Sequence, residues 1–121
     1  MQSSYRDLKV WQRSIDLAEQ IYRLTATFPS SEVYGLTSQM KRAAVSISSN
    51  VAEGWGRRSR KEYSRFVLLA HGSKDELQTQ IVIAKRLGFG KATQLDQADE
   101  LCEEIGKMLN GLHRFLQKPH R

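Results

Sequence analysis

The segment QMKRAAVSISSNVAEGWGRRSRKEY, residues 39–63, contains a helix, a chain reversal and the start of a second helix. In its first half, apolar residues recur every three or four positions, as on the buried side of an amphipathic helix. These residues are Met40, Ala44, Ile47 and Val51. The Gly-Trp-Gly sequence at 54–56 ends this periodicity. Residues 59–62, Ser-Arg-Lys-Glu, then have the form of a capping box, which marks a helix start. The segment therefore predicts an antiparallel helical hairpin.

Similar helical periodicity covers most of the chain on both sides of this hairpin. Residues from about 8 to 28 form one apolar stripe, and Ser30 or Ser31 offers the N-cap of the helix that precedes residue 54. The helix that begins near residue 59 continues to the Gly-Phe-Gly turn at 88–90, and a fourth helix follows it. Long helices joined by short connections double back on their neighbours. The expected fold class is all-α, an antiparallel up-down-up-down four-helix bundle.

Composition is that of a folded, soluble chain. Its 121 residues are 40% hydrophobic and 26% charged, which suits one domain over residues 1–121. The lone Cys102 falls in an apolar helical register, so we expect a reduced thiol in the core. The N-terminus lacks the apolar segment of a signal peptide, and no run approaches the ~18 apolar residues of a membrane span. We expect a cytoplasmic protein that does not contact a membrane.

Positive charge is concentrated at one end of the expected bundle. The net charge is +6, from 19 Lys and Arg against 13 Asp and Glu. In an up-down bundle the chain start, the connection after the second helix and the chain end share one end. Eleven cations and only two acids, Asp7 and Glu62, fall there, so this end carries about +9 and the remainder about −3. The cations are Arg6, Lys9, Arg13, Arg57, Arg58, Arg60, Lys61, Arg65, Arg114, Lys118 and Arg121.

Such an end is suited to the phosphates of RNA or DNA. The residues predicted to bind are Arg57, Arg58, Arg60, Lys61, Arg65, Lys118 and Arg121. The alternative is a solvated bundle end at which cations are easily accommodated. Trp55, beside these arginines, either stacks on an exposed base or seals the end of the core.

A second set of small and polar residues predicts a polar seam between the second and third helices. Its members are Gln39, Arg42, Ser46, Asn50, Glu53, Gly72 and Glu76. In the expected hairpin, paired residue numbers sum to about 115, which places Ala43 against Gly72, Ser46 against Leu69 and Arg42 within reach of Glu76. Gly72 would then permit close helix approach. The alternative is a ligand or metal pocket, but His71, His113 and His120 are scattered and no Glu-x-x-His pair occurs, so we expect no metal and no cofactor.

The third helix has too many apolar residues for one core. Residues 66–70 and 81–84 are consecutive apolar runs that encircle it. Contiguous exposed apolar surface usually marks a contact surface, so we expect a homo-oligomer with an interface at Val67, Leu68, Val82 and Ile83. The alternative is an unusually broad core. No phosphate-binding glycine loop, nucleophile elbow or paired acid and histidine is present, so we expect no enzyme.

Four segments resemble the bacterial four-helix-bundle proteins of the ribosomal RNA intervening-sequence family. They are residues 7–11 (DLKVW), 32–36 (EVYGL), 39–54 (QMKRAAVSISSNVAEG) and 72–80 (GSKDELQTQ). Residues at the family's recurring positions are Ser46, Asn50, Glu53, Gly54, Gly72 and Glu76, to which the family assigns no chemistry.

This resemblance implies a small cytosolic bundle that assembles as a homopentamer and whose molecular role is not established. A more distant relation, the accessory protein of diversity-generating retroelements, is a basic pentameric bundle that contacts nucleic acid and a reverse transcriptase. Together with the charge distribution, the resemblance favours a non-catalytic oligomer that binds RNA or DNA through its basic end. The rival hypothesis is a protein–protein scaffold without a nucleic-acid role, and a third is a ligand pocket on the polar seam.

Overall fold

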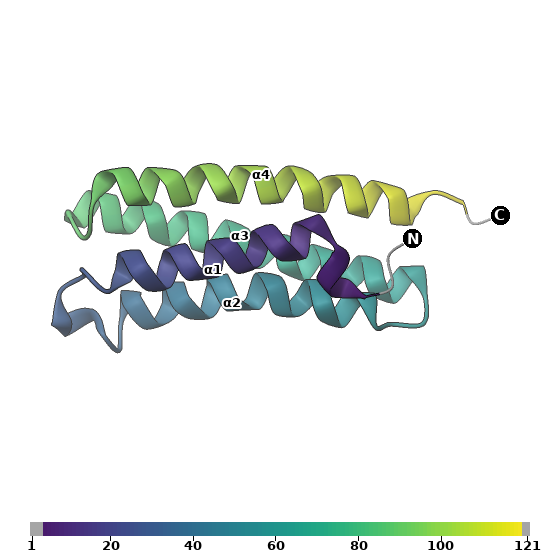
Figure 1. Cartoon of the computed structure of the whole chain (residues 1–121), viewed down its shortest axis with the longest axis horizontal. Helices are drawn as coiled ribbons and strands as arrows, with labels where there is room; N and C mark the ends of the chain where they lie inside the picture. The colour runs from purple at the N-terminus through teal and green to yellow at the C-terminus, as the bar shows by residue number, and fades with distance from the viewer. Residues whose placement is uncertain (1–3, 120–121) are drawn as a thin grey trace.

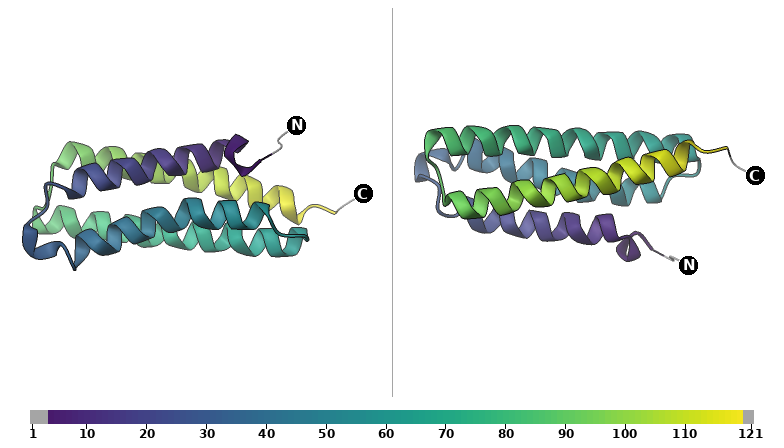
Figure 2. Two further views of the ribbon diagram at one scale, coloured as in Figure 1. Left: turned by 60° about the horizontal axis from the view of Figure 1, so that its bottom comes forward. Right: turned by 90° about the horizontal axis from the view of Figure 1, so that it is seen from above.

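Four long helices make up nearly all of the protein. The structure is a computed structural model that describes residues 4–119. In chain order the elements are the 3₁₀ turn η1 (Tyr5–Asp7), α1 (Lys9–Thr25), the 3₁₀ turn η2 (Ser30–Glu32), α2 (Leu36–Trp55), α3 (Arg60–Leu87) and α4 (Ala92–Gln117). Successive helices run in opposite directions (Figures 1 and 2), which confirms the predicted up-down-up-down bundle.

The core lies along the axis of the bundle, where each helix contacts the one before it and α4 closes the circle against α1. Large aliphatic side chains at helical spacing fill it, and burial of each contributes about 1.5–3 kcal/mol relative to exposure. The members that are at most 1% exposed include Leu17, Ile21, Met40, Ile47, Leu77, Ile81, Leu95, Ile105 and Leu109. Cys102 is also buried here, as its register predicted.

The start of α2 differs from the prediction. Neither Ser30 nor Ser31 caps a long helix; instead η2 occupies this stretch and α2 begins at Leu36. Gly35 has φ −113° and ψ −118°, which is outside the helical region and separates η2 from α2. The Glu32 carboxylate accepts a hydrogen bond from the Leu36 N–H at 3.1 Å, the role expected of a capping serine.

The ends of α3 follow the prediction. The Ser59 hydroxyl accepts a hydrogen bond from the Glu62 N–H at 3.1 Å, as a capping serine should. At the other end Gly88 adopts a left-handed conformation with φ 72°, and the Phe89 N–H reaches back to the Ala84 carbonyl at 2.9 Å. The Phe89 ring then packs against Phe28, with ring centres 5.7 Å apart.

Helices α2 and α3 pack most closely near their connection. Gly54 lies inside α2, and a Cβ there would be 2.9 Å from Phe66 Cβ and 2.9 Å from Tyr63 Cδ1. Farther along, the hydroxyl oxygens of Ser46 and Ser73 are 2.9 Å apart. Their numbers sum to 119, about one helical turn from the predicted register, which was therefore wrong. Side chains lean toward the N-terminus of their helix. In this hairpin an α2 side chain therefore leans away from the turn and an α3 side chain leans toward it. An α2 residue thus meets an α3 partner that is farther from the turn than the Cα positions suggest.

Within residues 4–119 no helix combines the length and the apolar character that crossing a bilayer requires.

Candidate nucleic-acid interface

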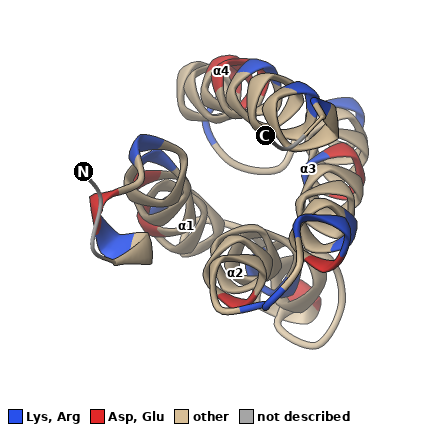
Figure 3. Cartoon of the chain, turned by 90° about the vertical axis from the view of Figure 1, so that its right-hand side faces the viewer, with Lys and Arg blue, Asp and Glu red and all other residues tan. Residues whose placement is uncertain are grey.

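The connection between α2 and α3, the start of α1 and the end of α4 all lie at one end of the bundle (Figure 1). Viewed from this end, lysine and arginine positions mark the connection and the last turns of α4 (Figure 3). An arginine ties the two together, because Arg60 Nη2 donates to the Phe115 carbonyl at 2.8 Å and its guanidinium lies 4.9 Å from the centre of the Phe115 ring. We call this surface the basic end, defined by Arg57, Arg58, Arg60, Lys61, Arg65 and Lys118. Arg121, also predicted to bind, lies outside the described residues.

Two arginines of the basic end are held in fixed positions. The Arg57 and Arg65 guanidiniums lie 4.5 Å and 4.8 Å from the centre of the Phe66 ring. Each also has a carboxylate neighbour, with Arg57 3.1 Å from Glu53 and Arg65 3.6 Å from Glu62. Their charge is partly balanced, and their planar groups are preorganised by cation–π contacts.

Arg58, Lys61 and Lys118 differ from these arginines because they are exposed and, among residues 4–119, join no ion pair. Arg58 lies in the connection, Lys61 in the first turn of α3 and Lys118 just after α4. Their ammonium and guanidinium groups therefore keep all their donors for an external anion.

A hollow of about 550 Å³ opens between the first turns of α3 and the last turns of α4. Its lining combines two cations, one acid, three other hydrogen-bonding side chains and two leucines: Lys61, Arg65, Glu62, Ser64, His113, Gln117, Leu68 and Leu116. Gln117 Nε2 donates to the Ser64 hydroxyl at 2.8 Å, which links the two helices. Sequence reasoning found Lys61 and Arg65 but missed Ser64, His113 and Gln117. His113 and Gln117 lie on α4, and only the packing of α4 against α3 places them beside Ser64 and Arg65.

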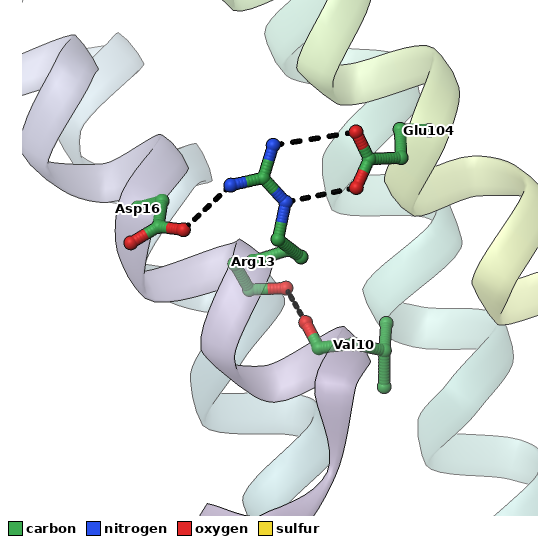
Figure 4. A network of polar contacts seen from close by, with 5 residues as sticks. Val10, Arg13, Asp16 and Glu104 are labelled. Atoms are coloured by element: carbon green, nitrogen blue, oxygen red, sulfur yellow. Dashed lines mark hydrogen bonds and ion pairs between the residues drawn. The ribbon is translucent and has the colours of Figure 1, made fainter.

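Arg13 was predicted to add positive charge to the basic end, but its guanidinium binds two acids within the bundle (Figure 4). Its Nε and Nη2 lie 2.8 Å and 3.3 Å from the Glu104 carboxylate, and its Nη1 lies 2.7 Å from Asp16. These hydrogen bonds raise the pKa of Arg13, and the bond from Arg13 lowers the pKa of Glu104. Arg13 thus joins α1 to α4 and does not add free charge to the end.

Trp55 is half-buried and packs against the core, with its ring centre 6.5 Å from that of Tyr63 in an edge-on arrangement. This placement favours the sealing role over the base-stacking role.

The residues predicted to form a polar seam do not act as one group. Ser46 and Asn50 lie between α2 and α3, where Asn50 Nδ2 donates to the Ser46 carbonyl at 2.8 Å. Glu53 pairs instead with Arg57 at the basic end, and Gln39 is exposed.

Nor do the remaining seam residues make the expected contacts. Arg42 and Glu76, both exposed, form no ion pair in the described part of the chain, and Glu76 accepts a hydrogen bond from Gln80 at 3.3 Å. Gly72 was predicted to permit close approach of α2 to α3. This is wrong, because a Cβ on Gly72 would meet nothing within 4 Å.

A polar network that the sequence did not predict lies between α3 and α4. Lys74 is 6% exposed, and its ammonium lies 2.9 Å from Gln78 Oε1 and 2.8 Å from Asp75. Gln78 Nε2 in turn donates to Glu103 at 2.8 Å. Gly106 makes room for this lysine, because a Cβ there would be 3.1 Å from Lys74 Cε. Among residues 4–119 no group of three His, Cys, Asp or Glu side chains is placed to hold a metal ion.

Several large apolar side chains of α3 are exposed on its outward side. Leu68, Val82 and Ile83, predicted to form an oligomer interface, are 54%, 49% and 43% exposed, and Leu69 is similar. Val67 was assigned to the same interface, which is wrong: it is 1% exposed because it points into the core.

Comparison with known proteins identifies the family. Among solved structures, a protein of unknown function from the S23 ribosomal protein family of Bacteroides thetaiotaomicron has the same fold, with a TM-score of 0.78 and 19% sequence identity over 87% of this chain and 98% of that one. No curated protein matches. The model of the 23S rRNA-intervening sequence protein family matches residues 6–111. The chain therefore belongs to the 23S rRNA-intervening sequence protein family.

Proposed function

We propose that this protein is a non-catalytic nucleic-acid-binding bundle of the cytoplasm whose basic end contacts the phosphates of RNA or DNA. The observation that carries the proposal is the cluster of exposed cations, Arg58, Lys61 and Lys118, which lack acidic partners among the described residues. Phosphate contacts by such side chains dominate the affinity of proteins for nucleic acids.

The hollow between α3 and α4 supports this proposal. Its cations, Lys61 and Arg65, stand beside Ser64, His113 and Gln117, whose side chains can hydrogen-bond to sugar hydroxyls or base edges. A surface that served solubility alone would need no such combination.

Salt-dependent titration tests the basic end. Contact of four cations with duplex phosphates gives a slope of log K against log salt near −3.6, or a loss of roughly 150-fold between 50 and 200 mM salt. The variant Arg58→Gln, Lys61→Gln, Lys118→Gln is expected to flatten this slope by about 2–3. Fluorescence anisotropy with labelled RNA and DNA of equal length measures both.

A matched control separates local from global charge. The variant Arg23→Gln, Arg86→Gln, Lys91→Gln removes the same charge from exposed positions at the opposite end of the bundle. It should bind as the unchanged protein does. Equal binding by all three proteins, or binding that ignores salt, would refute the proposal.

We also propose that the protein self-associates through the outward side of α3, the α3 outer face. This surface comprises Leu68, Leu69, Gly72, Glu76, Val82 and Ile83. Four large apolar side chains on one exposed helix face are unusual in a monomer and typical of a subunit contact. Light scattering at micromolar concentration should give a mass of several chains, and Val82→Glu should lower it. A monomer would refute self-association.

A further inference from the structure

A second partly apolar surface lies between α1 and α2, across the bundle from the α3 outer face. It is a groove of about 440 Å³, here called the α1–α2 groove, lined among others by Tyr22, Val33, Tyr34, Lys41, Arg42 and Val45. Tyr34 is 97% exposed, although tyrosine carries a large apolar ring. Lys41 covers the Tyr22 ring, with its ammonium 4.7 Å from the ring centre.

The two surfaces differ in the sign of their charge. The groove contributes the cations Lys41 and Arg42 and its lining contains no acid. The α3 outer face has an acid, Glu76, between its two apolar pairs, whereas the carboxylate of the neighbouring Asp75 is bound to Lys74 within the chain. Neither Arg42 nor Glu76 forms an ion pair among residues 4–119, so the two can meet each other between copies.

Their positions along the bundle also agree. The groove is formed by the end of α1 and the first turns of α2, at the end opposite the basic end. Ser46 and Ser73 show that level residues of α2 and α3 have numbers that sum to about 119, so Arg42 lies level with residue 77 of α3 and Leu36 with Ile83. In two parallel copies side by side, Glu76 of one therefore stands level with Arg42 of the next, and Val82 and Ile83 stand level with the start of α2, beside Tyr34.

Gly72 fits the same arrangement. It is exposed, its position is open to solvent, and Leu68, Leu69 and Glu76 are its neighbours on the helix face. Glycine in an exposed helix interior is unfavourable for a monomer, but it lets another backbone or ring come close.

We propose that the α3 outer face of one copy packs into the α1–α2 groove of the next. The inference rests on the self-association proposed above and specifies how the copies meet. Because the two surfaces differ, the contact is heterologous. Such a contact closes a ring when the rotation between successive copies permits. With parallel copies, every basic end then lies on one side of the ring.

Site-specific cross-linking tests the geometry. Tyr34→Cys and Val82→Cys both alter exposed positions, and native Cys102 stays unreactive because burial raises its pKa to about 12. Co-expressed with different tags, the two variants should form a mixed disulfide dimer, whereas neither alone should cross-link. Thr93→Cys, exposed on α4 at the same end, replaces either partner as the control and should give no product.

Charge reversal gives an independent readout. Arg42→Glu and Glu76→Arg should each weaken association at least ~10-fold, because like charges then face each other, and the double variant should restore it. Cross-linking of Val82→Cys with itself would show that α3 meets α3, which overturns this geometry but leaves self-association intact. An oligomer with neither cross-link, or a groove occupied by nucleic acid in a monomer, would also overturn it.

Discussion

At the scale of single residues, two helical glycines have opposite surroundings. Gly54 is buried where α2 meets α3, and a Cβ there would be 2.9 Å from Phe66 Cβ. Gly72 faces open space. The same chemical change, one added methyl group, should therefore affect the two positions in opposite directions.

We predict that Gly54→Ala lowers the free energy of unfolding by about 1–2 kcal/mol, since overpacking against Phe66 and Tyr63 outweighs the better helix propensity of alanine. Gly72→Ala should raise it by about 0.5–1 kcal/mol. Urea denaturation of the two variants, at protein concentrations low enough to keep both monomeric, measures the difference. A stabilised Gly54→Ala variant would show that α2 and α3 do not pack as described.

Burial of individual residues was the part that the sequence specified least. Residues 66–70 are all apolar, so periodicity does not distinguish Val67, in the core, from Leu68, on the surface. Only the direction from which α2 and α4 approach α3 makes this choice.

At the scale of elements, α1 and α4 pack together through the apolar core, and the ion pair of Arg13 with Glu104 links them beside it. Because Arg13 lowers the pKa of Glu104, this contact stabilises the folded state above the ordinary pKa of a glutamate, and the contribution is lost as pH falls through the lowered value.

We predict that Glu104→Gln destabilises the protein by about 0.5–1 kcal/mol at pH 7, a modest amount because both side chains are partly exposed. Near pH 3 the variant and the unchanged protein should be about equally stable. Glu100→Gln, at an exposed position one turn earlier on α4, is the control and should have little effect at either pH. Chemical denaturation across pH measures all three, and a constant difference would contradict the linkage.

Helix number, order and most boundaries followed from periodicity and from the glycine and serine signals. The start of α2 did not, because Ser30 and Ser31 resemble N-caps equally well whether the chain continues as a 3₁₀ turn or as a long helix. The α2–α3 register was missed by one turn, since a sequence count ignores the lean of side chains.

At the scale of the whole molecule, direction reversal at each connection collects both chain ends and the α2–α3 connection at one end. The sequence predicts which segments gather at this end, because their positions depend only on the order and direction of the helices. It does not predict the hollow beside it, since His113 and Gln117 reach Ser64 and Arg65 only through α3–α4 packing.

We predict that nucleic-acid affinity depends on assembly as well as on the cations. If several basic ends share one side of an oligomer, a long RNA can bind more than one of them, which raises the apparent affinity. Val82→Glu, which leaves the basic end unchanged, should weaken binding of a long RNA by ~10-fold or more and of a short RNA very little. Thr93→Glu carries the same charge change outside both surfaces and should bind both RNAs normally.

The contact of Lys74 with Gly106 has a consequence for how this bundle tolerates change over evolution. The end of the lysine side chain lies 3.1 Å from where a Cβ at position 106 would be. A side chain at 106 would therefore push the lysine out of its place, and a shorter residue at 74 would relieve this contact. Among related chains these two positions, 32 apart in sequence, should covary in size, with glycine at the second wherever a long cation stands at the first.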